Sequence, residues 1–187
     1  LACSKRTGQQ VNDKPSQEQY AFFYNADVLT LLDTALFDDS PKDLFQREPY
    51  IAAFRSKATG FSFILCSVHT DPDHAVTEIA ALVDVAAWIP KRFKNSSNII
   101  ICGDFNASCT YAKPAQLNTL AIHKKPYTWI IPDTVKTNLS EKSRCTYDRF
   151  VVNAPLSTKV SRWEVLRYFK SKTVSDHWPV YIELSQQ

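Results

Sequence analysis

The sequence lacks the features that mark membrane-spanning chains and secretory precursors. None of its apolar runs approaches the roughly 18 residues that a membrane span requires, so we expect no membrane partner. No basic segment followed by an apolar stretch opens the chain, so no signal peptide is visible. The first residue is Leu1 rather than Met, which indicates a processed product, a fragment or a trimmed chain.

Glycine and closely paired cysteines are also scarce. Only three glycines occur, so turns must rely on Pro, Asn, Asp and Ser. The five cysteines include no C-x-x-C pair, and we therefore expect no structural zinc site. Cys66 and Cys102 lie in apolar runs and are expected to be small buried thiols. Cys109 and Cys145 lie in polar loops, where a bridge between them would suit an oxidising compartment.

The composition is that of an ordinary globular protein. Hydrophobic residues make up 44% of the 187 residues and charged residues 22%, which suits one domain with a real core over residues 1–187. The net charge of +3 is only mildly favourable for a polyanionic partner. Asn95 and Asn138 each begin an Asn-x-Ser sequon in a polar stretch, which is compatible with secretion.

Hydrophobic patterning predicts a strand-rich chain. Residues 75–89 fit a helix with a broad apolar face, and residues 114–122 favour a second helix. We expect strands over 20–24, 28–36, 50–55, 61–69, 98–102, 150–152, 159–165 and 180–184. A helix that joins two apolar strands favours the α/β (α+β) class, with a mixed sheet, or two sheets, and helices packed outside.

Four segments share one design, in which acidic, His or Asn side chains flank an apolar strand directly. Strand ends are where a rigid scaffold can hold polar groups at the rim of a cleft. His69 ends the expected strand 61–69, and an imidazole there is suited to acid–base catalysis near neutral pH. A single His at a strand end is more often structural, so this segment is weak by itself.

Asp104 and Asn106 form the second such segment, directly after the apolar strand 98–102. Two residues apart in extended chain, they share a face, and a carboxylate beside an amide suits an oxygen-liganded cation and a bound phosphate. Gly103 allows another group to approach the backbone closely. The alternative interpretation is an ordinary turn after a strand.

Asp148 and the dipeptide Asp176-His177 complete the set. Asp148 can orient an imidazole and stabilise its charged form, or it can form an ordinary surface ion pair with Arg149. Asp176 and His177 precede the expected strand 180–184 and offer a metal ligand beside an acid–base group. By itself, Asp-His is a common dipeptide.

Together, these segments are far more specific than any one of them. Gly-Asp-Phe-Asn at 103–106, Tyr-Asp-Arg at 147–149 and Ser-Asp-His-Trp-Pro-Val at 175–180 resemble the endonuclease/exonuclease/phosphatase superfamily. Longer matches, which run in the family's order from about residue 14, narrow the resemblance to the deoxyribonuclease I family. They are QEQY (17–20), FQREP (45–49), SVHT (67–70), GDFNASCTY (103–111), TWIIPD (128–133) and CTYDR (145–149).

The resemblance implies a four-layer sandwich of two packed mixed β-sheets flanked by helices. It also implies a metal-dependent endonuclease that hydrolyses DNA phosphodiester bonds with little sequence specificity and leaves 5′-phosphates. Mg²⁺ or Mn²⁺ would assist the chemistry, Ca²⁺ often binds as well, and the partner is DNA. The expected location is secreted or extracellular, including the lumen of the secretory pathway.

By motif, His69 and His177 match the family's two catalytic histidines. Glu18 matches the carboxylate paired with the first, and Asp148 matches the one paired with the second. Each carboxylate would raise the basicity of its imidazole and orient it. One pair would take a proton from the attacking water while the other protonates the leaving 3′ oxygen.

Further residues match the family's metal, DNA and disulfide positions. Asp104 and Asp176 match residues at the metal, Asn106 a phosphate-binding residue, and Arg47 an arginine that contacts DNA. Cys109 and Cys145 match the family's principal disulfide, which would tie the loop after Asp104 to the segment that carries Asp148.

The chain departs from the family mainly at its start. The family's initial strand carries an active-site Asn, and a later strand carries a metal-binding Glu, but nothing before Glu18 matches them. The only acid in residues 1–17 is Asp13. We therefore expect the N-terminal strands to be missing, and we interpret the chain as a fragment or trimmed form of an active nuclease.

Smaller departures concern DNA and calcium. Ser16 stands where the family has an aromatic residue that stacks on DNA, which predicts weaker minor-groove contact. Asp39 and Asp43 are candidate Ca²⁺ ligands in a shortened loop, whereas Lys136 occupies the position of a Ca²⁺-binding Asp. Cys3 has no matched partner.

Two other functions stay open. Another superfamily enzyme, acting on inositol phosphates, sphingomyelin or abasic DNA, is disfavoured by the QEQY and REP segments and by the cysteine pair. A catalytically impaired relative that serves as a binding module is favoured by the missing metal-binding Glu. No feature of the sequence predicts actin binding.

Overall fold

The computed structural model describes residues 1–8, 10–11, 14–15, 17–94 and 97–185. Its main element is a six-stranded sheet in the order β5-β6-β7-β8-β10-β9. The strands are β5 (Leu29–Leu36), β6 (Tyr50–Ser56), β7 (Ser62–His69), β8 (Ile99–Asp104), β9 (Tyr127–Trp129) and β10 (Asp148–Asn153). Only β7 and β8 run parallel, so the sheet is mixed.

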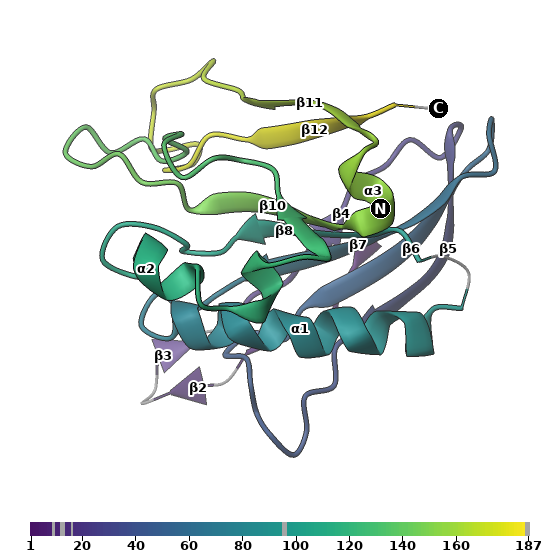
Figure 1. Cartoon of the computed structure of the whole chain (residues 1–187), viewed down its shortest axis with the longest axis horizontal. Coiled ribbons are helices and arrows are strands. Elements are labelled where there is room, and N and C mark those ends of the chain that lie inside the picture. Colours follow the sequence, from purple (N-terminus) through teal and green to yellow (C-terminus); the bar gives the residue numbers. More distant parts are fainter. Residues whose placement is uncertain (9, 12–13, 16, 95–96, 186–187) are drawn as a thin grey trace.

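Helix α1 (Ala75–Arg92) is the crossover that makes this parallel pair possible. It lies along one face of the sheet (Figure 1). Its buried side chains, among them Ile79, Leu82 and Ile89, pack in one cluster with sheet residues such as Ile64 and Ile101. Alternate residues of each strand point to this face, as the apolar runs of β7 and β8 predict.

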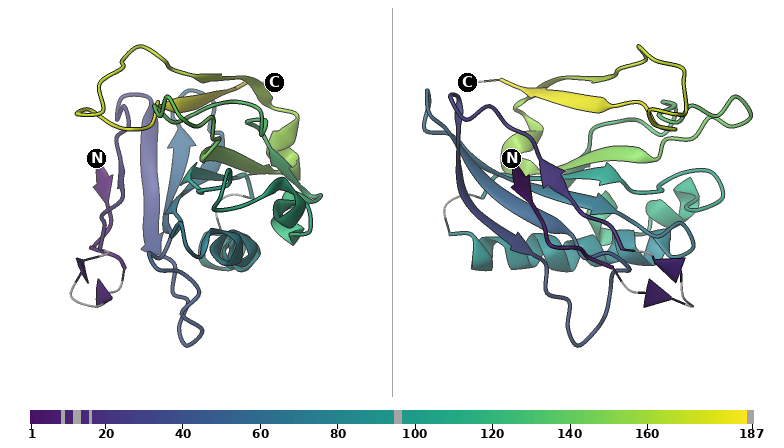
Figure 2. Two further views of the ribbon diagram at one scale, coloured as in Figure 1. Left: turned by 90° about the vertical axis from the view of Figure 1, so that its left-hand side faces the viewer. Right: turned by 180° about the vertical axis from the view of Figure 1, so that it is seen from behind.

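The opposite face carries two separate two-stranded pairs. One joins β1 (Ala2–Cys3) to β4 (Ala21–Phe22), and the other joins β11 (Val160–Val165) to β12 (Val180–Leu184). Phe22 packs its ring on Tyr50 and Phe54 of β6. The β11–β12 pair lies beside β10 (Figures 1 and 2). It covers a second apolar cluster whose buried members are Ile100, Val152 and Leu156.

The expected α/β class is therefore confirmed, with strands on both sides of a packed core and α1 outside. Strand β4 is shorter than the expected 20–24 and pairs with β1, not with the next strand along the chain. A further short pair joins β2 (Gln10–Val11) to β3 (Lys14–Pro15). Within the described residues, no helix is long and apolar enough to cross a membrane.

The second expected helix, over 114–122, is wrong as one element. The chain forms α2 (Pro114–Leu117) and a 3₁₀ turn η1 (Ala121–His123), because Leu120 between them is extended, with φ −72° and ψ 141°. The three-residue strand β9 and the short helix α3 (Ala154–Ser157) were not expected. Such short elements depend on tertiary pairing more than on periodicity.

We expect Leu82→Ala to lower the free energy of unfolding by about 2–5 kcal/mol, because Leu82 is fully buried between α1 and the sheet. Urea denaturation measures this change. Asp84→Ala on the same helix is the control, since its ion pair with Lys42 is exposed, and we expect a change within about 0.5 kcal/mol. Equal losses in the two variants would contradict this packing.

Candidate active site

Three of the predicted site residues form one row across the main sheet. In the register of the parallel pair, His69 at the end of β7 lies opposite Asp104 at the end of β8. In the antiparallel pair on the other side, Asp148 at the start of β10 lies opposite Asp104. Neighbouring strands therefore place an imidazole and two carboxylates side by side at one edge.

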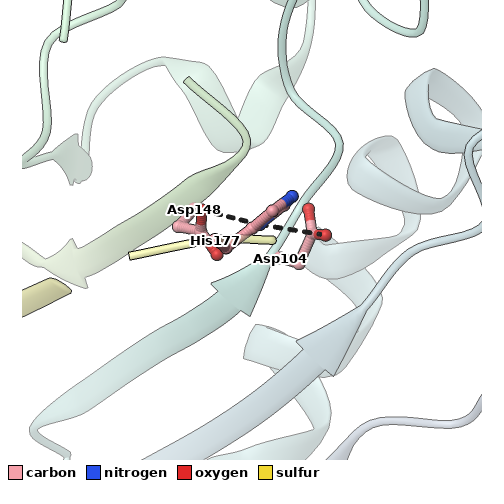
Figure 3. A group of neighbouring side chains, drawn as sticks. All are labelled: Asp104, Asp148 and His177. Carbon is pink, nitrogen blue, oxygen red and sulfur yellow. Dashed lines mark ion pairs between the residues drawn. The ribbon is translucent and has the colours of Figure 1, made fainter. Parts of the chain in front are cut away.

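His177 reaches this row from outside the sheet, on the segment that precedes β12. Its Nδ1 lies 3.0 Å from Oδ2 of Asp148 and 3.6 Å from Oδ2 of Asp104 (Figure 3). Two backbone bonds hold the segment in place, from Trp178 N to Thr137 O at 2.9 Å and from Leu139 N to Asp176 O at 2.7 Å. The ring of His177 also stacks on Tyr147, with centroids 5.5 Å apart.

His69 has a matching arrangement on the other side of Asp104. Its Nδ1 lies 2.8 Å from Oε2 of Glu18, and its Nε2 lies 3.6 Å from Oδ2 of Asp104. The phenol of Tyr20 accepts the backbone N–H of His69 at 3.0 Å. The two predicted histidines, 108 positions apart in the numbering, therefore meet at one carboxylate oxygen.

Burial and neighbouring charges shift the pKa values of several groups at the site. Burial of the carboxyl group and the nearby charge of Asp148 raise the pKa of Asp104. Burial opposes the charged form of His177, but the hydrogen bond and charge of Asp148, with the charges of Asp104 and Asp176, raise its pKa to about 9. Partial burial alone would raise the pKa of Glu18. The hydrogen bond and charge of His69 and the charge of Arg47 outweigh this effect, so the pKa of Glu18 is lowered overall. Such opposed effects are typical of functional sites.

The donor set around Asp104 fits a divalent cation. Ligand atoms of Asp104, Asp148 and His177 all lie within 4.8 Å of one another, and this is the one such group among the described residues. Two carboxylates suit Mg²⁺ or Mn²⁺. Besides burial, repulsion from Asp148 raises the pKa of Asp104, and a cation would relieve that repulsion. Asp176 is exposed and lies outside this group, so its role as a metal ligand stays a prediction.

Asn106 is buried and joins two loops of the site. Its backbone adopts φ 47°, its N–H donates to Oδ1 of Asp104 at 2.8 Å, and its Nδ2 donates to Thr70 O at 2.8 Å. These bonds turn Oδ2 of Asp104 toward the histidines and connect the loop after β8 with the loop after β7. The binding of phosphate by Asn106 stays a prediction.

Arg47 is buried under the first histidine pair. Its Nε donates to His69 O at 3.0 Å, and its Nη1 lies 3.6 Å from Oε1 of Glu18. Only 9% of its side chain is exposed, so it is not the free surface arginine that a DNA contact suggests. Its buried Nη2 has no hydrogen-bond partner among the described residues, and direct contact of Arg47 with DNA stays a prediction.

The alternative of a surface ion pair between Asp148 and Arg149 is wrong. Arg149 is 1% exposed and lies 2.8 Å from Oδ1 of Asp133. It also donates to the carbonyl groups of Ile131 at 2.6 Å and Ala107 at 2.9 Å. Adjacent residues of a strand point to opposite faces, so Asp148 faces His177 while Arg149 faces the loops behind the site.

The disulfide that the resemblance implies is present between Cys109 and Cys145, with Cα atoms 5.7 Å apart. It ties the loop after Asp104 to the segment before Asp148. Cys66 is a buried free thiol as expected, Cys102 is half-buried, and Cys3 is free and exposed.

The structure uses the candidate calcium residues differently. Oδ2 of Asp39 accepts the backbone N–H groups of Leu44 at 2.7 Å and Phe45 at 3.0 Å, which closes the 38–43 loop. Asp43 has φ 51° in this loop. A calcium ion held by Asp39 and Asp43 stays a prediction. The ammonium group of Lys136 donates a hydrogen bond to the carbonyl of Ser140 and lies over the ring of Trp178.

Other sequence predictions concern residues outside the described ranges or groups that are buried. Asp13, Ser16 and Asn95 lie outside the described residues. Asn138 is buried, and its Nδ2 donates to Ser143 Oγ. A glycan on Asn138 is therefore incompatible with this folded arrangement.

Two supporting residues were missed from the sequence. The hydroxyl of Thr137 accepts the N–H groups of Tyr147 and Asp148, while its carbonyl accepts that of Trp178, so it supports both members of the second pair. Glu78 is 2% exposed on the sheet-facing side of α1. A carboxylate within the apolar stripe of a helix is the signal that could have identified Glu78.

Comparisons with known proteins agree with this geometry. A sequence model of the endonuclease/exonuclease/phosphatase family matches residues 6–177. The chain is 33% identical to Deoxyribonuclease-1-like 1 of Rattus norvegicus, over 91% of this chain and 57% of that protein. It is 31% identical to Deoxyribonuclease-1 of Gallus gallus, over 90% of this chain and 65% of that protein. The chain thus spans less than two thirds of the length of these relatives.

Solved structures show the same fold. The structure of D. rerio TDP2 with a single strand DNA product matches with a TM-score of 0.61 and 16% identity, over 83% of this chain and 68% of that chain. The mannosyl-6-phosphatase Bt3783 of Bacteroides thetaiotaomicron VPI-5482 matches with a TM-score of 0.60 and 21% identity, over 86% and 68%. At these identities, the likeness concerns the fold alone.

Gly103 allows β7 and β8 to approach at the site, which generates a test. It has φ +137°, and a Cβ there would lie 2.0 Å from Val68 O. We expect Gly103→Ala to lower the free energy of unfolding by more than the about 1–2 kcal/mol of a residue strained in φ alone. Gly60→Ala is the matched control, because Gly60 has φ +71° and open space around it. Urea denaturation that gave equal losses would contradict the close approach.

Proposed function

Because the chain belongs to the endonuclease/exonuclease/phosphatase family, we propose that it carries the catalytic residues of a divalent-cation-dependent endonuclease. Its substrate is DNA, cleaved with little sequence specificity to leave 5′-phosphates. The observation that carries this proposal is the approach of His69 and His177 to the same oxygen of Asp104, at 3.6 Å each. The deoxyribonuclease names of relatives at 31–33% identity support DNA as the substrate.

The two histidine–carboxylate pairs perform the proton transfers. Glu18 and Asp148 each hold one imidazole, orient its ring and stabilise its charged form. One imidazole takes a proton from the attacking water, and the other gives a proton to the leaving 3′ oxygen. Because both rings approach Asp104, a phosphate at Asp104 can be reached by both in one step.

Asp104 and Asp148 present the oxygen atoms that would hold Mg²⁺ or Mn²⁺. Such an ion would stabilise the negative charge that develops on the phosphoryl oxygens. Arg47 adds a buried positive charge beside Glu18, and this charge favours an anionic phosphate at the site. Asn106 keeps Asp104 oriented during the reaction.

Exposed cations beside His177 fit a DNA backbone. Lys170 and Lys172 are exposed on the segment between β11 and His177. Arg167 donates to Lys136 O and lies over the ring of Trp178, so its position is set by the protein. Arg162 is paired with Glu164 and Glu183, and we assign it no contact with DNA.

The Cys109–Cys145 disulfide and the deoxyribonuclease relatives support a secreted protein, or one in the lumen of the secretory pathway. We propose that a calcium ion held by Asp39 and Asp43 would stabilise their loop and take no part in the reaction. Asp39 already closes this loop by accepting the backbone N–H groups of Leu44 and Phe45.

His69→Ala and His177→Ala are each expected to lower kcat/KM on plasmid DNA by about 10²–10⁴-fold, because each removes one proton-transfer group. A plasmid-nicking assay measures the rates. His123→Ala is the control, since the ring of His123 packs on Trp129 and belongs to neither histidine–carboxylate pair. Nuclease activity that survived both catalytic substitutions would refute the proposed mechanism.

Removal of divalent cations is expected to abolish cleavage, and Mg²⁺ or Mn²⁺ is expected to restore it. Asp104→Asn should weaken binding of Mn²⁺ in isothermal titration calorimetry, because it removes a charged ligand from the Asp104–Asp148 pair. Asp176→Asn, outside that group, should change the affinity less. Full activity in EDTA would exclude the metal-dependent reaction, and absence of both metal binding and cleavage would favour the binding-module alternative.

A further inference from the structure

Glu78 is a charged residue in a position where the fold alone would favour an apolar one. It lies on the buried face of α1 with Ala75, Ile79 and Leu82, and only 2% of it is exposed. Among the described residues, it is the only buried carboxylate. Burial raises the pKa of its carboxyl group, so the charged form needs compensating contacts to persist there.

Those contacts come from two loops that carry site residues. Oε1 of Glu78 accepts the backbone N–H of Gln46 at 2.9 Å, and Oε2 accepts that of Asp71 at 3.1 Å. Gln46 directly precedes Arg47, and Asp71 follows His69 by two positions. One carboxylate on α1 therefore holds both the loop that precedes β6 and the loop that follows β7.

A second contact, made by Arg47, joins the same two loops. Arg47 donates to the carbonyl of His69 at 3.0 Å and lies 3.6 Å from Glu18, the partner of the His69 imidazole. The positive charge of Arg47 also favours the ionised form of Glu78. Arg47 thus interacts electrostatically with both Glu78 and Glu18.

The loop that Glu78 holds also contacts the other half of the site. Between His69 and Asp71, Thr70 donates its N–H to Asp104 O at 3.0 Å and accepts the Nδ2 of Asn106 at 2.8 Å. A shift of the 69–71 loop would therefore move His69 relative to both Asp104 and Asn106. Sub-ångström placement of this kind decides whether reacting groups meet.

We infer that Glu78 is a positioning residue, which holds the Glu18–His69 pair and Arg47 in reacting geometry without touching the substrate. The inference rests on the proposed nuclease function for its kinetic readout. Neither the catalytic row nor the metal-binding group includes Glu78, which acts from the far side of the two loops.

Glu78→Gln tests the inference, because a Gln amide can accept only one of the two N–H groups and turns its own NH₂ toward the other. We expect kcat on plasmid DNA to fall by about 10–100-fold, with KM changed less than kcat. Glu78→Asp keeps the charge and should recover part of kcat. Asp84→Asn, exposed on the same helix, should leave kcat unchanged.

A double-mutant cycle separates positioning from general stability. If Glu78 acts through His69, Glu78→Gln should cost much less in the His69→Ala background than in the native protein. Equal fold losses in both backgrounds, or an unchanged kcat in folded Glu78→Gln protein, would overturn the inference. Thermal unfolding of each variant identifies any that do not fold.

Amide hydrogen exchange provides a readout that does not depend on nuclease activity. The N–H groups of Gln46 and Asp71 should be protected in the native protein, and both should exchange faster in Glu78→Asp. Rapid exchange of both amides in the native protein would overturn the inference. Failure of DNA cleavage with both amides protected would instead count against the proposed function alone.

Discussion

The site depends on the contact between the two parallel strands β7 and β8. Their register places His69 opposite Asp104, and the antiparallel partner β10 adds Asp148 to the same row. Gly103 makes this row possible, because any Cβ there would collide with Val68 O. Close backbone approach at the strand ends thus brings an imidazole and two carboxylates together, before any loop contributes.

Buried polar contacts outside the sheet complete this row. Arg149 donates hydrogen bonds to the carbonyl groups of Ile131 and Ala107 and so joins two loops behind the site. Thr137 accepts hydrogen bonds from Asp148 and from the segment that carries His177. Glu78 does the same for the loops that carry Arg47 and His69. Groups of this kind are costly to bury and specific in direction, so they convert a general α/β scaffold into one arrangement of catalytic side chains.

Much of the fold was predictable, because long strands and α1 have strong periodic patterns. The expected strands at 28–36, 50–55, 61–69 and 180–184 match β5, β6, β7 and β12 closely. Prediction failed at short elements such as β9 and at the helix expected over 114–122. Periodicity needs several turns or alternations, whereas a three-residue strand or a single helical turn is set by its neighbours.

By itself, the sequence determined which residues are the candidates for the chemistry, because motif identity and position at strand ends are local properties. His69, Asp104, Asp148 and His177 could all be named that way, and the structure brings them together. Only the tertiary structure decided that Arg149 pairs with Asp133, that Arg47 is buried, and that Glu78 holds two loops. Burial and side-chain pairing depend on residues far apart in the chain, which no local pattern records.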